Sequence, residues 1–150
     1  MVNITTLATS AGFMLFNFQN LVLDSSFGRA VENNPVISNP TNSPPSANQM
    51  WSLVPSVSSP GTFNLQSQLG PFLSYSGAPN GPIEFAQATL HASLPANFVL
   101  QSSGTSFVFI EATSNLTLTS WPIQGSLISP PVTYEVFHGA SQQLWGVQSS

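Results

Sequence analysis

The sequence predicts an all-β protein with a β-trefoil fold, in which twelve short strands form three pseudo-symmetric units of four. Pro or Gly interrupts nearly every window long enough for three helical turns. Trp51, Phe98 and Trp145 follow one another at intervals of 47 residues (98 − 51 and 145 − 98). Three four-stranded units, none of which can bury its apolar face alone, close into a barrel capped by hairpins.

Short segments of β-branched and aromatic residues recur along the chain and mark the expected strands. These segments lie near residues 13–18, 21–24, 35–38, 49–54, 62–66, 72–75, 83–87, 97–101, 106–111, 115–119, 131–136 and 143–147. We place the repeats of this single domain at about residues 11–60, 61–104 and 105–150. A two-sheet sandwich would not predict the 47-residue spacing, and a propeller usually has four to eight blades.

The segments that open the repeats also match one another. Residues 15–18, 63–66 and 110–113 lie 48 and 47 residues apart, and Leu21–Leu23 precedes Leu116–Leu118 by 95 residues. The middle counterpart of these second strands, Phe72–Tyr75, comes a few residues late. A longer hairpin in the second repeat would explain the delay.

The chain has one basic and five acidic residues, so that 4% of it is charged where an ordinary domain has about 25%. Arg29 alone cannot form the basic surface that displaces phosphate counterions, so nucleic-acid binding is excluded. A polybasic membrane anchor is excluded for the same reason. Apolar residues still make up 41% of the chain, which is enough to bury one core and argues against disorder.

The chain contains no cysteine, which excludes disulfides and thiolate metal ligands. The first residues have neither the basic nor the apolar region of a signal peptide. The longest apolar runs have four residues and cannot span a bilayer. We therefore expect a cytoplasmic protein with no membrane insertion, and the absence of metal and cofactor motifs predicts neither a metal nor a cofactor.

Neutral polar residues replace the missing charges, since Ser, Thr, Asn and Gln make up 57 of the 150 residues. Their donors and acceptors match the hydroxyl groups of sugars. The same composition also suits a surface that is kept soluble without charge. Composition alone leaves both interpretations open.

Two Q-x-W motifs end the first and third repeats, Gln49-Met50-Trp51 and Gln143-Leu144-Trp145, with Ala96-Asn97-Phe98 as a degenerate copy between them. They resemble the motif of ricin B-chain-like (R-type) lectins, which are sugar-binding β-trefoils. The resemblance covers essentially the whole chain and is greatest to small, cysteine-free basidiomycete lectins. It implies that the three aromatic residues pack in the barrel core rather than against sugar.

In that family, sugar is bound by an Asp after the second strand and by an Asn before the Gln of Q-x-W. In the first repeat Asp24 and Asn48 occupy these positions, and Gln49 is expected to orient Asp24 or the backbone. A carboxylate can accept hydrogen bonds from two vicinal hydroxyls. Thr119 and Gln142 stand at these positions in the third repeat, and the second repeat also lacks the acid. The resemblance thus implies one site, although Asp24 could instead cap a turn.

The loop from Ser38 to Ala47 is expected to form a wall of this site, stiffened by its prolines. Asn39, Asn42 and Ser46 are the side chains expected to reach a ligand, and a solvated turn is the alternative. Many relatives carry an aromatic residue in this loop, whereas here there is none.

Two further aromatic residues follow the second strands of the first and third repeats, Phe27 and Trp121. Each could stack on the C–H groups of a pyranose ring or could cover the end of the barrel. We include Phe27 among the candidate sugar-binding residues. Trp121, near Glu135 and His138, is a candidate for a second, divergent site.

We do not expect enzymatic activity. The two histidines, His91 and His138, lie in different repeats, and the chain has neither a nucleophile elbow nor a zinc-protease motif. Glycosidases need two neighbouring carboxylates, and here five acids are scattered over three repeats. The alternative function is a β-trefoil protease inhibitor, in which Arg29 would enter a trypsin-like pocket; inhibition of a cysteine protease would not need it.

The sequence therefore predicts a non-catalytic lectin for terminal galactose- or N-acetylgalactosamine-type glycans, with one site in the first repeat. A shallow site binds a single sugar weakly, so useful avidity requires several linked sites. We expect a homodimer for this reason. By resemblance the protein is fungal and serves in defence against grazing animals.

Overall fold

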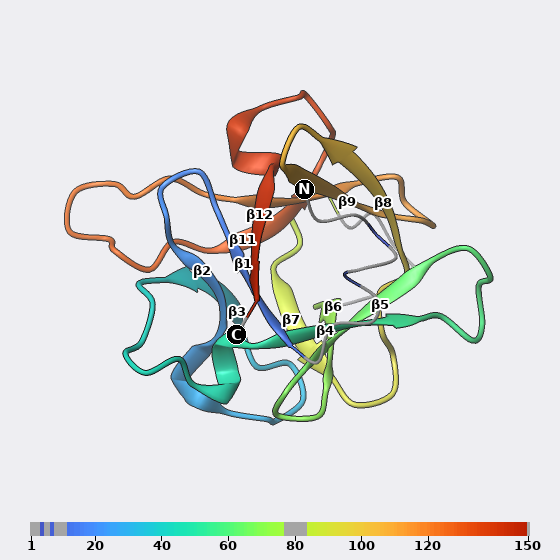
Figure 1. Cartoon of the computed structure of the whole chain (residues 1–150), viewed down its shortest axis with the longest axis horizontal. Helices are drawn as coiled ribbons and strands as arrows, with labels where there is room; N and C mark the ends of the chain where they lie inside the picture. Colours follow the sequence, from blue (N-terminus) through green and yellow to red (C-terminus); the bar gives the residue numbers. More distant parts are fainter. Residues whose placement is uncertain (1–3, 5–6, 8–11, 77–83, 150) are drawn as a thin grey trace.

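The computed structural model describes residues 4, 7, 12–76 and 84–149. Over these residues the chain forms twelve strands and three short 3-10 helices (Figure 1). The strands are β1 (Phe13–Phe16), β2 (Val22–Ser25), β3 (Val36–Asn39), β4 (Trp51–Pro55), β5 (Phe63–Ser67), β6 (Phe72–Tyr75), β7 (Ala88–His91), β8 (Phe98–Ser103), β9 (Ser106–Glu111), β10 (Thr117–Ser120), β11 (Val132–Glu135) and β12 (Trp145–Ser149). The helices are η1 (Ser26–Gly28), η2 (Ala47–Gln49) and η3 (Ser141–Gln143). None of the described helices is long and apolar enough to cross a membrane.

Six of the strands form a closed antiparallel barrel. Going round the ring, β1 pairs with β4, β4 with β5, β5 with β8, β8 with β9 and β9 with β12. The first and last strands close it, with Phe13 opposite Ser149 and Phe16 opposite Gly146. β1 and β12 lie next to each other near the middle of Figure 1.

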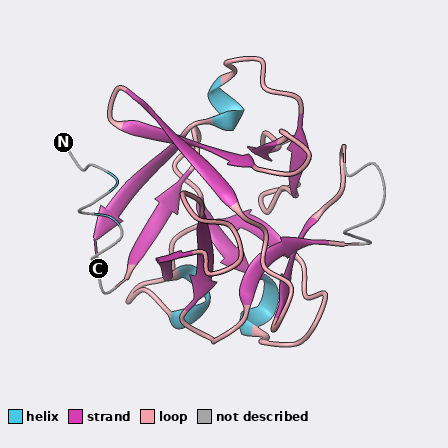
Figure 2. Ribbon diagram, turned by 90° about the vertical axis from the view of Figure 1, so that its right-hand side faces the viewer, coloured by secondary structure: helices cyan, strands magenta, loops and turns pink. Residues whose placement is uncertain are grey.

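The other six strands form three hairpins that cap one end of the barrel. The hairpins are β2–β3, β6–β7 and β10–β11, and the first strand of each continues from a barrel strand. Isolated bridges between Pro35 and Thr89, Ile37 and Pro131, and Gln87 and Thr133 join the hairpins to one another. Strands supply nearly all of the regular structure, and the short helices lie in the connections (Figure 2). This arrangement confirms the predicted β-trefoil.

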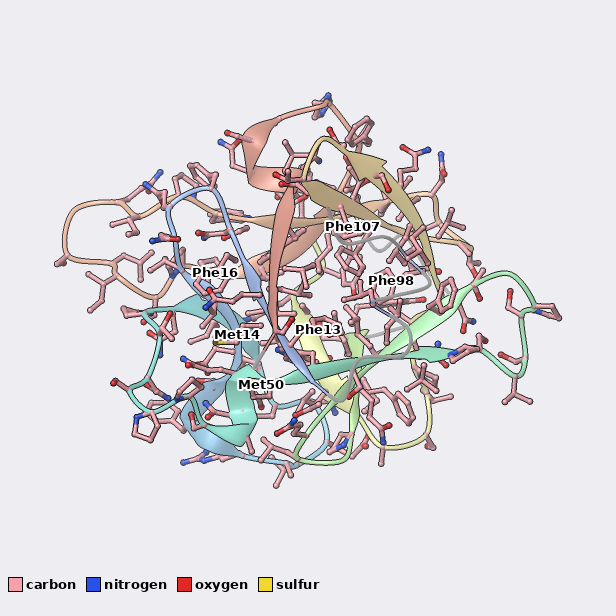
Figure 3. The ribbon with its side chains drawn as sticks, in the orientation of Figure 1. Phe13, Met14, Phe16, Met50, Phe98 and Phe107 are labelled. Carbon is pink, nitrogen blue, oxygen red and sulfur yellow. The ribbon has the colours of Figure 1, made fainter. Side chains whose placement is uncertain are left out.

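The core contains the aromatic residues that mark the repeats. Trp51, Phe98 and Trp145 are fully buried, as the sequence predicts. Figure 3 shows Phe98 lying between the barrel strands with Phe13 and Phe107, which are also buried. Burial of side chains of this size supplies much of the hydrophobic stabilisation of a small barrel.

A second, smaller apolar cluster holds the first Q-x-W segment in place. Met50 packs with Met14 and Val22, and Phe16 lies against them (Figure 3). Because neighbouring residues in a strand point to opposite sides, Met50 meets this cluster while Trp51 points into the barrel. The preceding residue, Gln49, is thereby fixed beside β2.

One predicted strand is misplaced. The sequence predicts a strand at residues 83–87, of which residue 83 lies outside the described residues. Glu84 and Phe85 instead form a turn, in which Phe85 has φ 66°, and β7 begins at Ala88. The register explains the shift, since Leu73 of β6 pairs with Leu90 and both are fully buried. The expected strands at 49–54 and 143–147 begin later as well, because η2 and η3 occupy their first residues.

Candidate functional site

A hollow of about 620 Å³ lies over the hairpin of the first repeat. The predicted site residues that line it are Asp24, Phe27, Asn39, Asn42 and Asn48. Ser46 and Gln49 do not line the hollow, but both are hydrogen-bonded to residues that do. The structure therefore brings all the predicted residues together in one place.

Asp24 forms the floor of the hollow. It lies near the end of β2, is 1% exposed, and receives three hydrogen bonds from side-chain amides. Asn48 Nδ2 donates to Oδ1 at 3.1 Å, while Gln49 Nε2 and Asn39 Nδ2 donate to Oδ2 at 2.8 and 3.2 Å. Among the described residues every hydrogen bond to this carboxylate comes from a side chain, so Asp24 does not act as a backbone turn cap.

The environment of Asp24 changes its acidity in two opposing ways. Burial raises the pKa of the carboxyl group above its ordinary value, and the hydrogen bonds from Gln49, Asn39 and Asn48 lower it in part. Burial is the larger effect because all three donors are neutral amides, which stabilise the charge less than a cation would. The net pKa of Asp24 is raised.

Gln49 connects the loop of residues 40–47 to the floor. Its Oε1 accepts the backbone N–H of Asn42 at 2.9 Å, and its Nε2 donates to the carbonyl of Pro40 at 2.9 Å as well as to Asp24. Gln49 is fully buried. This is the orienting role that its place in the Q-x-W motif predicts.

A chain of polar side chains runs from the floor to the outer wall. Asn48 donates from Nδ2 to the carbonyl of Ser25 at 3.2 Å as well as to Asp24, and its Oδ1 accepts the hydroxyl of Ser46 at 2.5 Å. Ser46 in turn accepts a hydrogen bond from Asn42 Nδ2 at 2.6 Å. Ser46 thus supports the wall, while Asn42 and Asn48 face the hollow.

Phe27 stands at the rim of the hollow on η1. The residue is 87% exposed, so it does not cover the end of the barrel. Its backbone is left-handed, with φ 57° and ψ 18°, a conformation that is rare for a bulky residue and stores strain. Arg29 lies over one side of the ring, with its guanidinium carbon 5.5 Å from the ring centre. The exposed ring is therefore available to a flat apolar partner.

Four lining residues were not predicted from the sequence: Ser26, Gly28, Ile37 and Ser129. Gly28 has φ 66°, and a Cβ there would lie 4.0 Å from the Asn48 side chain. Ser129 belongs to the third repeat, and its hydroxyl donates to Asn39 Oδ1 at 2.5 Å. The threefold arrangement of the hairpins was the one signal that could have placed this segment beside β3.

The other two repeats also carry hollows. That of the third repeat has about 220 Å³ and is lined by residues that include Thr119, Trp121, Glu135 and His138. Trp121 is 41% exposed, and its indole N–H is shared between the Thr133 hydroxyl at 2.9 Å and the Glu135 carboxylate at 3.1 Å. The hollow of the second repeat has about 270 Å³ and is lined by Tyr75, His91, Leu94 and Asn97, among others.

The candidate metal ligands are dispersed. Within residues 4, 7, 12–76 and 84–149, no three His, Asp or Glu side chains are grouped closely enough to hold a metal ion.

No family model and no curated protein matches the chain. Solved structures do. The Rhizoctonia solani agglutinin superposes with a TM-score of 0.79 at 16% identity, over 94% of this chain and 96% of that one. A ricin B-like lectin of Macrolepiota procera, in complex with lactose, gives 0.73 at 17% identity over 93% and 95% of the two chains. The C-half of an earthworm R-type lectin, in complex with GalNAc, gives 0.65 at 16% identity over 93% and 98%.

The same fold also occurs as part of larger proteins. The chain covers 30% of an exo-β-1,3-galactanase of Clostridium thermocellum, with a TM-score of 0.78 and 14% identity. At these identities the likeness shows the fold and leaves the activity open. The chain has the β-trefoil fold found in ricin B-like lectins.

Proposed function

We propose that this protein is a non-catalytic lectin that binds terminal galactose or N-acetylgalactosamine of glycans in the hollow of the first repeat. The observation that carries the proposal is the Asp24 carboxylate, held by three amides at the floor of the hollow with an exposed Phe27 at its rim. A carboxylate in a fixed orientation binds sugar hydroxyls without losing side-chain entropy.

The free lone pairs of Asp24 suit a sugar hydroxyl. A carboxylate offers about four acceptor positions, and the three amides occupy one position on Oδ1 and two on Oδ2. One position on Oδ1 remains, next to the Asn48 amide. Asn48 and Asn42 provide further polar groups for a neighbouring hydroxyl.

The aromatic ring at the rim favours a sugar with one apolar face. Galactose has its axial 4-hydroxyl on one side of the ring, so the C–H groups on the other side form such a face. This face can pack on the exposed ring of Phe27 while the hydroxyls turn towards Asp24. The lactose and GalNAc in the complexes of the two β-trefoil lectins agree with this class of ligand.

The number of acidic residues at the hollow supports binding without catalysis. Asp24 is the one acidic residue among the described residues that line the hollow. Hydrolysis of a glycosidic bond ordinarily requires two carboxylates on either side of that bond.

The proposed function includes a homodimer that holds two sugar sites together. One shallow site buries few atoms of a sugar, and weak single sites become useful when two are held together. We propose a homodimer in the cytoplasm, with a role in defence. A surface with 4% charged residues offers little electrostatic opposition to self-association.

A glycan array tests the proposal. The full chain, shown to be folded by circular dichroism and thermal unfolding, is expected to bind glycans that end in galactose or N-acetylgalactosamine. Binding to no glycan by the folded protein would overturn the proposal. Inhibition of papain-like or trypsin-like proteases by the same preparation would support the alternative function.

A further inference from the structure

We infer that the hollow of the first repeat accommodates a disaccharide, and that Ser129 of the third repeat contacts its second sugar. This inference rests on the proposed function and adds the size of the ligand. The segment of residues 122–131, between β10 and β11, would then determine which disaccharides bind. It reaches out at the left of Figure 1, above the β2–β3 hairpin.

The size of the hollow supports more than one sugar. Its volume of about 620 Å³ is more than twice that of the corresponding hollows of the second and third repeats, about 270 and 220 Å³. Ser129 and Ile37 are among the residues that line it, and Ser129 comes from a different repeat. The hollow is therefore a composite site that two repeats build together.

Hydrogen bonds hold the third-repeat segment against the first repeat. The backbone N–H of Ser38 donates to the carbonyl of Pro130 at 2.9 Å, and Ile37 forms a bridge with Pro131. Beneath them the buried hydroxyls of Ser38 and Ser120 are 2.7 Å apart. A wall that is already in place lets a ligand bind without an entropic cost for ordering it.

The far end of the segment is fixed as well. The backbone N–H of Leu127 donates to the carbonyl of Gln124 at 2.9 Å, which closes a turn. The backbone N–H of Ile123 donates to Gln19 Oε1 at 2.7 Å. The start of the segment is therefore attached to the β1–β2 connection of the first repeat.

Ser129 extends the polar floor outwards. Its hydroxyl donates to Asn39 Oδ1, and Asn39 Nδ2 donates to Asp24 at 3.2 Å. Since the proton of the Ser129 hydroxyl is used, its oxygen is left to accept a hydrogen bond from a ligand. Ile37, which also lines the hollow, adds an apolar side chain. A second pyranose offers both a hydroxyl donor and C–H groups to these two residues.

Calorimetric titration with galactose, N-acetylgalactosamine and lactose tests the inference. We expect the unmodified chain to bind lactose about tenfold more tightly than galactose, which corresponds to one added favourable contact. Ser129→Ala should remove most of that tenfold advantage. It should weaken the binding of lactose more than the binding of the monosaccharides.

Two controls separate recognition from a structural role. Ser129→Thr keeps the hydroxyl and should retain the preference for lactose. Leu94→Ser removes an exposed apolar side chain from the hollow of the second repeat and should leave both affinities unchanged.

The outcomes distinguish the two proposals. Equal affinities of the unmodified chain for lactose and galactose, or a parallel loss of both in Ser129→Ala, would overturn the inference and leave the proposed function standing. If the folded chain binds none of the three sugars and no glycan on the array, the proposed function and the inference both fail.

Discussion

The first and third repeats share one hydrogen-bonded frame, which consists of the Q-x-W motif and the connection before it. They differ in the residue at the floor of the hollow. Gln49 Oε1 accepts the backbone N–H of Asn42 at 2.9 Å, and Gln143 Oε1 accepts that of His138 at 2.9 Å. The Nε2 atom of each Gln donates to a backbone carbonyl at 2.9 Å. The Q-x-W motif thus fixes the connection before the last strand of a repeat independently of what the hollow contains.

The floors differ by the residue that faces the Gln. Gln49 Nε2 meets the carboxylate of Asp24 at 2.8 Å, whereas Gln143 Nε2 meets the hydroxyl of Thr119 at 3.3 Å. The acid that lines the third-repeat hollow, Glu135, is on the other strand of the hairpin, where it accepts the indole N–H of Trp121. The motif therefore supports the fold, while one position on the hairpin decides whether a carboxylate faces the Gln at the floor of the hollow.

Replacing the aromatic residue of the frame should have the largest effect, and a similar effect in both repeats. Trp51→Ala and Trp145→Ala each remove a fully buried side chain and should lower the free energy of unfolding by about 3–5 kcal/mol. Each also removes an indole N–H that donates to a backbone carbonyl, of Leu23 and Leu118 respectively. Urea denaturation measures both losses. A small loss in one variant would show that the two frames are not equivalent.

Removing Asp24 should affect binding, whereas removing Thr119, its counterpart in the third repeat, should not. Asp24→Ala should weaken glycan binding at least about tenfold, because hydrogen bonds to charged groups are the stronger ones. It should also cost about 1–3 kcal/mol of stability, since three amides lose their acceptor. Thr119→Ala should leave binding unchanged.

Titration against immobilised galactose, together with thermal unfolding, measures both effects of Asp24→Ala. Full binding by the folded variant would contradict the proposed site. If the variant does not fold, Asp24→Asn, which keeps the size of the side chain, replaces it in the same assay.

The pH dependence of binding should identify the same carboxylate. Binding that needs ionised Asp24 should weaken as the pH falls through its raised pKa, which is above the ordinary value of 3.8. Stability should change in the opposite direction. Because the folded state holds this proton more tightly than the unfolded state, stability should fall as the pH rises from 3.8 through the raised pKa.

Calorimetry between about pH 3.5 and about pH 7.5 records affinity, and urea denaturation over the same range records stability. In Asp24→Ala the contribution of this group to the stability profile should disappear. A loss of affinity that sets in at the same pH in a variant without Asp24 would point to another group.

The exposed aromatic residues should show the smallest effect. Phe27→Ala should weaken galactose binding by about two- to tenfold, the range of an aromatic stacking contact. Its free energy of unfolding should change by no more than about 0.5 kcal/mol, because the ring is 87% exposed. Trp121→Ala, in the corresponding loop, should leave galactose binding unchanged. Equal losses in both variants would indicate that the third repeat also binds galactose.

The sequence allowed the barrel to be predicted because Trp51, Phe98 and Trp145 repeat a buried position at a fixed interval. It also indicated the residues around Asp24 and Asn48, since they are close in sequence to the ends of the hairpin and to the motif. It did not locate the strand at 88–91, which depends on pairing with β6. Local composition carries little information about such register.

The contribution of the third repeat to the hollow could not be predicted from local sequence. Ser129 meets Asn39 across a separation of 90 residues, and nothing in the residues around either of them signals the contact. The exposure of Phe27 depends likewise on its left-handed backbone in η1, a conformation that sequence preferences do not favour for phenylalanine. Both features arise from the tertiary arrangement.

The pairing of β1 with β12 has a consequence for how the protein forms. Phe13 and Ser149 are neighbours across this pair although 136 residues (149 − 13) separate them along the chain. Contacts of such long sequence separation raise the contact order, and proteins dominated by them fold slowly. The ring cannot close on the ribosome until β12 has emerged, so a nascent chain with two completed repeats still carries unpaired strand edges. Its vulnerability to aggregation is concentrated in that interval.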